Sequence, residues 1–191
     1  FGQELKSMNQ IIQADCDDIF RTVNLRPLRN KRILLTGASG LFGQYLIQTV
    51  ARANEVQKLN CGLEGISLHG PTPAMRKLLP NRNLTFRKKD LSRPFNLAGR
   101  YDYIFHAAGY AQPAKFVADP LSTVALNVLA TERLLEIARK NKATFLFFSS
   151  SAVYGEIPPE RIPAPETYNG NCSTTGLRAI YHESKRLGET I

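Results

Sequence analysis

The sequence predicts an α/β fold with a doubly wound parallel sheet, and three observations support this class. Short apolar segments alternate along the chain with longer segments whose apolar residues return at helical spacing. The short segments are apolar throughout, as in strands that a parallel sheet buries on both faces. A glycine-rich turn at residues 37–43 joins the first short segment to the first helical one.

The N-terminal residues lie outside this alternation. Apolar side chains over residues 4–21 return close to a helical period, so we expect a leading amphipathic helix, with Pro27 in the connection after it. We therefore divide the chain into an N-terminal helical extension, residues 1–30, and a sheet domain, residues 31–191.

The sheet domain is expected to contain five strands. Their predicted positions are residues 33–35, 65–69, 84–87, 101–106 and 144–148. Helices are expected over residues 41–53 and from the N-cap Asp119, through Pro120, to residue 140. A proline-rich loop is expected at 157–165, and a last helix is expected to begin near Gly176.

Composition and charge exclude several classes of protein. The 191 residues carry 25 Lys and Arg against 16 Asp and Glu, a formal charge of +9, and 43% are hydrophobic. This ordinary globular composition excludes collagen-like, low-complexity and wholly disordered chains. No stretch approaches the ~20 consecutive apolar residues of a membrane-spanning helix. The N-terminus carries acids and amides where a secretory signal is basic and then apolar, so we expect a cytoplasmic protein with no membrane partner.

The excess of positive charge does not by itself predict a nucleic-acid partner. Only residues 87–89 form a tight basic run, and no DNA- or RNA-binding motif accompanies it. A basic surface attracts an anionic small molecule such as a nucleotide equally well. We expect no nucleic-acid partner.

The cysteines and histidines show neither a disulfide framework nor the spacing of a metal site. Each type occurs three times, widely spaced and without a CxxC, HxxH or HExxH arrangement. We therefore expect reduced thiols and no bound metal. The six residues are Cys16, Cys61, Cys172, His69, His106 and His182.

The glycine turn between the first strand and the first helix predicts a dinucleotide site of the Rossmann type. One glycine permits the tight turn, another lets backbone N–H groups approach a pyrophosphate, and the third lets helix and strand pack closely. The helix N-terminus favours the phosphate charge. We predict that NAD or NADP contacts Gly37, Ala38, Ser39, Gly40, Leu41, Phe42 and Gly43.

The sequence leaves the choice between NAD and NADP open. A carboxylate that binds the adenosine ribose is expected at the end of the second strand, roughly 20 residues beyond the glycines. That strand is expected to end at His69 and Gly70 without a carboxylate, and Glu64 is expected to precede it. Arg76 and Lys77 either hold a 2′-phosphate or are solvated helix charges, which is the commoner arrangement.

Tyr181 and Lys185 form a candidate acid–base pair. At i, i+4 spacing, the two side chains lie on one face of a helix. A free tyrosine, with a pKa near 10, is a poor base at neutral pH, and a neighbouring ammonium lowers that pKa by stabilising the phenolate. Ser150 follows the predicted fifth strand, at the edge where open α/β sheets bind ligands, and can hydrogen-bond the reacting oxygen.

These motifs, in this order, resemble the extended short-chain dehydrogenases/reductases of the NAD-dependent epimerase/dehydratase family. The resemblance covers about residues 31–191. Its features are the Gly-x-x-Gly-x-x-Gly spacing after Thr36, the His-Ala-Ala-Gly stretch at 106–109, Asn127, Ser150, and the pair Tyr181 and Lys185.

The resemblance implies a role for each site residue. Tyr181 would be the acid–base group, Lys185 would bind the nicotinamide ribose and tune Tyr181, and Ser150 would orient the substrate oxygen. Asn127 would support the backbone of the site and belong to the cofactor-binding residues. The residues that would line the cofactor are Ala107 and Ala108, with Asp90 and Leu91 at the adenine. A turn cap is the alternative role for Asp90.

The resemblance favours NAD over NADP, which the sequence itself leaves open. It also implies a homodimer and nucleotide-activated sugar substrates, which are oxidised and re-reduced through a transient 4-keto sugar. Residues 176–186 look most like the UDP-glucuronate decarboxylase branch, where Arg178 would lie near the substrate; a solvent-facing helix residue is the alternative. Decarboxylases carry a Glu, and 4,6-dehydratases an Asp-Glu pair, where this chain has Ser151 and Ala152. Neither side chain is a competent acid or base at neutral pH.

We therefore favour epimerase-type chemistry from the sequence. Decarboxylase, 4,6-dehydratase or 4-keto reductase activity and a non-catalytic dinucleotide-binding module are the alternatives. Members of the family continue well beyond the helix in which this sequence ends. We expect a further substrate-binding part after residue 191, and we expect these residues alone to bind dinucleotide but to turn over sugar weakly or not at all.

Overall fold

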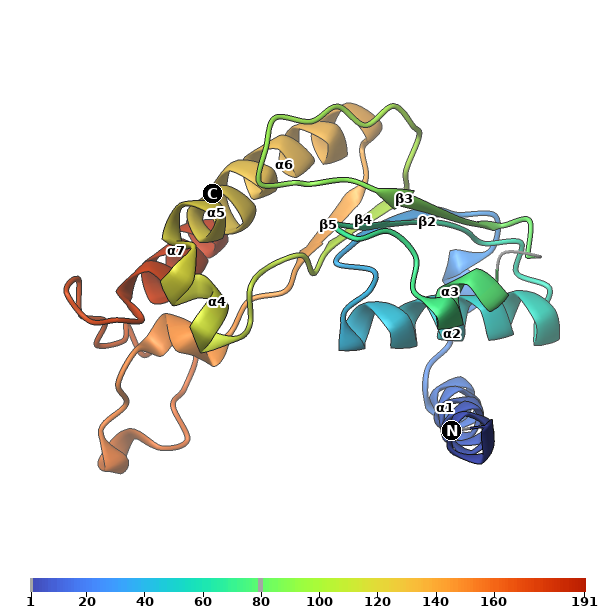
Figure 1. Ribbon diagram of the computed structural model, residues 1–191, viewed down its shortest axis with the longest axis horizontal. Helices are drawn as coiled ribbons and strands as arrows, with labels where there is room; N and C mark the ends of the chain where they lie inside the picture. The colour runs from blue at the N-terminus through green and yellow to red at the C-terminus, as the bar shows by residue number, and fades with distance from the viewer. Residues whose placement is uncertain (1, 79–80) are drawn as a thin grey trace.

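The protein is built around a five-stranded parallel sheet with helices on both faces (Figure 1). The computed structural model describes residues 2–78 and 81–191. The strand order is β3-β2-β1-β4-β5, so the sequence order reverses between β1 and β4, which is the switch point of a doubly wound sheet. The predicted fold class is confirmed. The strands are β1 (Arg32–Thr36), β2 (Gly62–Ser67), β3 (Leu84–Lys88), β4 (Tyr103–His106) and β5 (Thr144–Phe147).

The central strand β1 explains why apolar residues run without alternation. Ile33, Leu34 and Leu35 are each at most 1% exposed, because β2 and β4 flank the strand and helices cover both of its faces. The C-terminal end of β1 pairs Thr36 with Ile66 on one side and His106 on the other. The loops that follow β1 and β4 therefore leave the sheet at the same edge.

Two apolar cores lie on opposite faces of the sheet. Helix α2 (Leu41–Val56) and the short α3 (Pro73–Lys77) cover one face, and α6 (Ala130–Asn141) covers the other (Figure 1). On the α2 face, residues such as Ile47 and Val50 pack against the sheet, and on the α6 face Leu134 occupies the corresponding position.

The helix predicted from Asp119 begins where expected but is not uniform. The Asp119 carboxylate accepts the Ser122 N–H at 3.2 Å and caps α5 (Pro120–Val124). A π-helical turn, Ala125–Leu129, then joins α5 to α6. The sequence did not predict this turn or α4 (Pro113–Ala118), which has only six residues, and it indicated α3 only through the possible role of Arg76 and Lys77 as helix charges.

The N-terminal extension forms α1 (Gly2–Thr22), which packs on the outer side of α2 (Figure 1). Tyr45 donates its hydroxyl hydrogen to Asp15 at 2.9 Å, and Arg52 pairs with Asp17 at 3.4 Å. Between them the Cys16 sulfur lies 3.6 Å from the Thr49 hydroxyl and is buried. The 3-10 turn Arg26–Leu28 then leads into β1.

Several predicted boundaries are wrong. Glu64 lies inside β2 rather than before it, because its buried carboxylate accepts the Tyr101 hydroxyl and pairs with Arg87, both at 2.8 Å. The last helix, α7 (Ala179–Thr190), begins three residues after Gly176, since the exposed residues 176–178 form a turn.

Smaller differences concern the ends of strands and one loop. β2 extends from Gly62 to Ser67, β4 excludes residues 101 and 102, and β5 ends at Phe147. The proline-rich loop contains one 3-10 turn, Pro159–Arg161. Within residues 2–78 and 81–191, no helix combines the length and apolar character needed to cross a membrane.

Candidate active site

The glycine turn has the backbone geometry that its sequence predicts. Gly37 has φ of +71°, in the region that favours glycine, and a Cβ there would lie 2.5 Å from the Ala107 carbonyl group. A Cβ on Gly43 would overlap the Gly37 carbonyl oxygen, so this glycine lets α2 approach the turn. Gly40 is the N-cap of α2 without a side-chain cap, which leaves the first N–H groups of the helix available to an anion.

The loop after β4 lies directly against this turn. Ala107 donates its N–H to the Thr36 carbonyl at 3.3 Å, and Ala108 donates its N–H to the Thr36 hydroxyl at 3.2 Å. These bonds hold residues 107 and 108 beside Gly37 at the switch point between β1 and β4. Both alanines therefore lie beside the glycine turn, and their contact with a cofactor stays a prediction.

His106 continues this hydrogen-bond network from Thr36 to the π turn that contains Leu126. Its Nδ1 lies 2.7 Å from the Thr36 hydroxyl, and its Nε2 lies 3.0 Å from the Leu126 carbonyl oxygen. Because a carbonyl only accepts, Nε2 carries the hydrogen and Nδ1 accepts from Thr36. Burial lowers the pKa of His106 to about 4, so the ring is neutral at physiological pH.

This burial predicts a specific acid sensitivity. An unfolded histidine has a pKa near 6.5. Between that pH and about 4, His106 is therefore protonated in the unfolded chain and neutral in the folded protein. Stability should therefore fall as the pH drops through this window, by about 3 kcal/mol in total. Urea unfolding at several pH values between 7 and 4 measures this change. In His106→Gln this part of the pH dependence of stability should disappear. If the variant loses stability between pH 7 and 4 as the wild type does, His106 is not its cause.

Asn127 lies fully buried in the π turn and faces α7. Its amide nitrogen donates to the Ser184 hydroxyl at 2.9 Å, and Ser184 donates in turn to the Tyr181 carbonyl at 3.2 Å. Its side-chain oxygen has no hydrogen-bond donor among residues 2–78 and 81–191. A Cβ on Gly109 would lie 3.2 Å from that oxygen and 3.8 Å from the Lys185 ammonium.

Tyr181 and Lys185 both lie on the buried side of α7. The Tyr181 ring stacks on Phe116 of α4, with centroids 4.6 Å apart and planes inclined by 13°, and the residue is 7% exposed. Lys185 is 5% exposed, donates to the Phe148 carbonyl at 2.7 Å and lies 4.6 Å from the centre of the Phe147 ring. Burial lowers the pKa of Lys185 to about 8, and Glu189 partly opposes this shift.

Ser150 begins the 3-10 turn Ser151–Tyr154 after β5. Its hydroxyl accepts the Ala152 N–H at 3.2 Å, as the N-cap of that turn. Phe148, two residues earlier, lies 5.9 Å from the ring of Phe42 at the start of α2, so the serine turn and the glycine turn share one edge of the sheet. Ser151 is exposed and Ala152 is half-buried, and neither carries an ionisable group.

The remaining predicted residues are less closely tied to this edge. Asp90 forms the turn cap that was its alternative role: it accepts from the Ser92 hydroxyl at 2.6 Å and from the Ser92 N–H at 2.9 Å, and these bonds lower its pKa. Leu91 is 5% exposed and its side chain belongs to the core. Arg178 is exposed at the start of α7, and the exposed side chains of Arg76 and Lys77 lie on α3. Contacts of these residues with a ligand stay predictions.

Two contacts were missed by the sequence argument. Phe116, which stacks on Tyr181, lies 65 residues away in a short helix that no periodicity marks. Thr36 was noted only as the residue before the glycines, although it links the glycine turn to His106. A polar residue at the end of an otherwise apolar strand was the available signal for Thr36.

The residues present fit a nicotinamide dinucleotide. The glycine turn leaves room where a Cβ would collide with backbone, and the start of α2 offers free N–H groups. The buried Asn127 oxygen and the Lys185 ammonium face the same space beside Gly109, where a hydroxyl group would meet both an acceptor and a donor.

Comparisons with known proteins agree with this geometry. The model of the NAD dependent epimerase/dehydratase family matches residues 33–191. The chain is 30% identical over 162 residues to UDP-glucuronic acid decarboxylase 5 of Arabidopsis thaliana, covering 85% of this chain and 46% of the relative. It is 32% identical over 161 residues to UDP-glucuronic acid decarboxylase 1 of the same plant, covering 84% and 35%. The chain thus spans less than half the length of these relatives.

Solved structures of epimerases share the fold. A UDP-N-acetylglucosamine 4-epimerase from Methanobrevibacter ruminantium M1, in complex with UDP-N-acetylmuramic acid, matches with a TM-score of 0.62 at 28% identity, covering 85% of this chain and 49% of that structure. A UDP-galactose 4-epimerase matches with a TM-score of 0.62 at 25% identity, covering 83% and 49%. On the match to residues 33–191, the chain belongs to the NAD-dependent epimerase/dehydratase family.

Proposed function

We propose that the chain is the dinucleotide-binding and catalytic part of an enzyme that modifies nucleotide-activated sugars by epimerase-type chemistry. The observation that carries this proposal is the placement of Tyr181 and Lys185 on the buried face of α7, at the sheet edge that also bears the glycine turn and Ser150. With a bound nicotinamide dinucleotide to accept and return the hydride, these three side chains would suffice for the proton transfers that accompany oxidation and re-reduction of a sugar hydroxyl.

Each of the three residues has a distinct task in this proposal. The Tyr181 phenolate takes the proton from the sugar hydroxyl, and the resulting Tyr181 hydroxyl later returns it. Lys185, with a pKa of about 8, stays mostly protonated at neutral pH and stabilises the phenolate of Tyr181. Ser150 hydrogen-bonds the reacting oxygen and orients it.

The cofactor would be held by the residues around the switch point. The glycine turn would bind the pyrophosphate, Ala107 and Ala108 would line the pocket, and Lys185 would bind the nicotinamide ribose. Asp90 and Leu91 would lie at the adenine, and Arg178 would reach the substrate. A bound nicotinamide dinucleotide supplies the acceptor and donor of hydride.

Decarboxylation is the second candidate, because the curated relatives quoted above are UDP-glucuronic acid decarboxylases. Ala152 argues against it, since an alanine cannot transfer a proton where the decarboxylase pattern has a glutamate. The mass of the product separates the two activities, because decarboxylation releases carbon dioxide and epimerisation releases nothing.

A non-catalytic dinucleotide-binding module is the alternative from another class. Under that alternative, no nucleotide sugar would change the nicotinamide absorbance of the bound dinucleotide. We expect a transient change with at least one UDP- or dTDP-sugar. A sensor has no need of the intact set of Ser150, Tyr181 and Lys185, which supports the enzyme.

We expect NAD and NADP to bind with dissociation constants within about tenfold of each other, because β2 ends without a carboxylate. Leu68, the first residue after β2, is 41% exposed. Leu68→Asp would accept a hydrogen bond from the ribose 2′-hydroxyl and repel a 2′-phosphate, raising the preference for NAD by about tenfold or more. Calorimetry with both dinucleotides measures this, with Leu68→Asn as the uncharged control. A wild-type chain as selective for NAD as Leu68→Asp would contradict the expectation.

We also propose a homodimer in a cytoplasmic setting. Exposed apolar residues on adjoining helical segments support the dimer: Leu121 is 81%, Leu129 53% and Leu187 45% exposed. Sedimentation should give a dimer that Leu121→Glu converts to a monomer, and a wild-type monomer would contradict this. Two buried, unpaired thiols and one half-buried thiol support a reducing compartment.

A further inference from the structure

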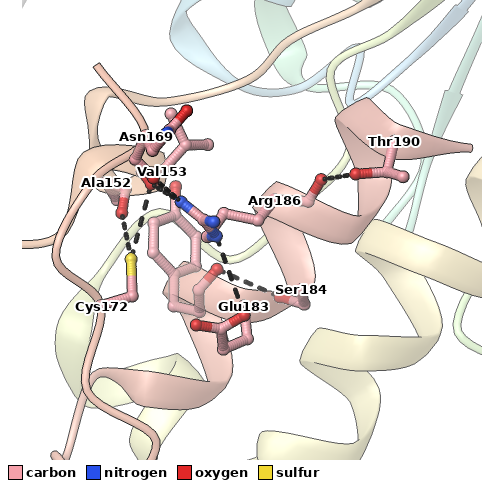
Figure 2. Close-up of polar contacts among 9 residues, drawn as sticks. Ala152, Val153, Asn169, Cys172, Glu183, Ser184, Arg186 and Thr190 are labelled. Carbon is pink, nitrogen blue, oxygen red and sulfur yellow. Dashed lines mark hydrogen bonds and ion pairs between the residues drawn. The ribbon is translucent and has the colours of Figure 1, made fainter.

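Arg186 follows Lys185 on α7 and contacts the turn that begins at Ser150 and continues through Ser151–Tyr154, called the serine-rich turn below (Figure 2). Its Nη1 donates to the Val153 carbonyl at 2.9 Å and to the Asn169 carbonyl at 2.7 Å. Both acceptors are backbone groups, so the guanidinium binds chain segments rather than a side-chain charge. Its contact with an acid is weak, because Nε lies 3.9 Å from Glu183.

The two carbonyls belong to segments that are paired with each other. Asn171 donates its N–H to the Tyr154 carbonyl at 2.8 Å, and Glu156 donates its N–H to the Asn171 carbonyl at 3.1 Å. Figure 2 shows the Cys172 thiol directed at this turn, with its sulfur 3.5 Å from the Val153 carbonyl oxygen. Residues 169–172 therefore form a strap across the serine-rich turn, and Arg186 binds both the strap and the turn.

Lys185 and Arg186, which are neighbours on α7, thus hydrogen-bond to the two ends of the segment 148–153. Lys185 donates to the Phe148 carbonyl at 2.7 Å, and Arg186 donates to the Val153 carbonyl five residues later. Ser150 lies between these two anchors. Two consecutive cationic side chains therefore connect the segment on either side of Ser150 to α7, the helix that carries Tyr181.

Both hydrogen bonds come from a single nitrogen, Nη1, at the far end of the Arg186 side chain. A guanidinium presents several N–H donors in a rigid plane, whereas an ammonium is a point charge on a flexible stem. The strap also lies close to the guanidinium and to the serine-rich turn, since a Cβ on Gly170 would lie 2.9 Å from the Arg186 Nη1 and 3.0 Å from the Val153 carbonyl oxygen. Gly170 has φ of +84°, and its missing side chain lets the strap and the guanidinium meet.

We propose that Arg186 is a positioning residue that sets the serine-rich turn against the helix of Tyr181 and Lys185. It acts through the Val153 and Asn169 carbonyls, without touching the reacting groups. The inference rests on the proposed function where it concerns turnover, but the mechanical link between α7 and the turn can be tested without any substrate.

The substrate-free test is amide hydrogen exchange on the chain. Arg186→Met keeps much of the aliphatic stem and removes every donor, so the amides of Glu156 and Asn171 should exchange about tenfold faster or more. Arg186→Lys should lie between Arg186→Met and wild type, because an ammonium keeps N–H donors but places them on a shorter, more flexible stem. Glu183→Gln removes only the weak ion pair and should leave both amides within about twofold of wild type.

The kinetic test separates positioning from general stability. In the longest natural form of the protein, Arg186→Met should lower kcat for a nucleotide sugar by about tenfold or more, with the dinucleotide dissociation constant within about twofold. Unchanged amide exchange in Arg186→Met would overturn the proposal, as would equal acceleration in Glu183→Gln. Parallel losses of kcat and dinucleotide affinity would also overturn it. If the wild type turns over no sugar, the proposed function fails, and the exchange measurement alone decides the role of Arg186.

Discussion

Replacing Tyr181 by phenylalanine should lower turnover of nucleotide sugars by about 10²–10⁴-fold while the dinucleotide stays bound, because the change removes the acid–base hydroxyl alone. The ring that stacks on Phe116 is retained, and so is the burial of residue 181. The glycine turn and Lys185 keep their contacts, so the affinity for dinucleotide should change little. Turnover is followed by product formation, and affinity by calorimetry.

Tyr168→Phe is the matched control for this change. Tyr168 lies near Tyr154 in the loop after β5, with ring centroids 6.1 Å apart, and has no assigned role in the chemistry. It should leave turnover unchanged. The longest natural form of the protein is the appropriate sample, because the chain spans less than half of its curated relatives. Normal turnover in Tyr181→Phe would remove Tyr181 from the mechanism.

Substituting Gly37 by alanine should abolish measurable dinucleotide binding and lower the melting temperature. The alanine would have to adopt φ of +71°, which costs about 1–2 kcal/mol, and its Cβ would lie 2.5 Å from the backbone of Ala107. Relief of that contact must move either the turn or the loop after β4, and both line the proposed pyrophosphate site. Fluorescence titration with NADH and thermal unfolding measure the two effects.

Gly62→Ala is the control glycine for this prediction. Gly62 begins β2, its backbone is free of positive φ, and a Cβ there would meet the Arg32 side chain at 3.6 Å, an ordinary contact. We expect dinucleotide affinity within about twofold of wild type in this variant. Wild-type affinity in Gly37→Ala would show that the turn does not bind the dinucleotide.

Local signals predicted most of the fold. The apolar run of β1, the glycines after it and the Asp119–Pro120 cap are each determined by neighbouring residues, and all three appear where expected. Glu64 was placed wrongly because its burial in β2 depends on Arg87 and on Tyr101, 37 residues away. No local pattern distinguishes such a carboxylate from one in a loop.

The contrast between local signals, which the sequence shows, and tertiary contacts, which it does not, also applies to the candidate site. The residue types of the motifs were visible in sequence, and the structure brings the glycine turn, residues 107–108 and the β5 end to one edge of the sheet. The π turn at Asn127 could not be predicted, since it accompanies tertiary contacts of the Leu126 carbonyl with His106 and of Asn127 with Ser184. The hydrogen bonds of Arg186 to the Val153 and Asn169 carbonyls likewise depend on how the loop between β5 and α7 folds back against the helix.

The central claim is that Ser150, Tyr181 and Lys185, with a bound nicotinamide dinucleotide, oxidise and re-reduce a sugar without changing its composition. Mass spectrometry of nucleotide sugars and cofactor, after incubation of the longest natural form of the protein with UDP- and dTDP-sugars, tests it most directly. We predict a new product with the mass of its substrate, distinguished by chromatography, and a cofactor that ends in its starting oxidation state. A product lighter by carbon dioxide or water, or no product from any of these sugars, would contradict the claim.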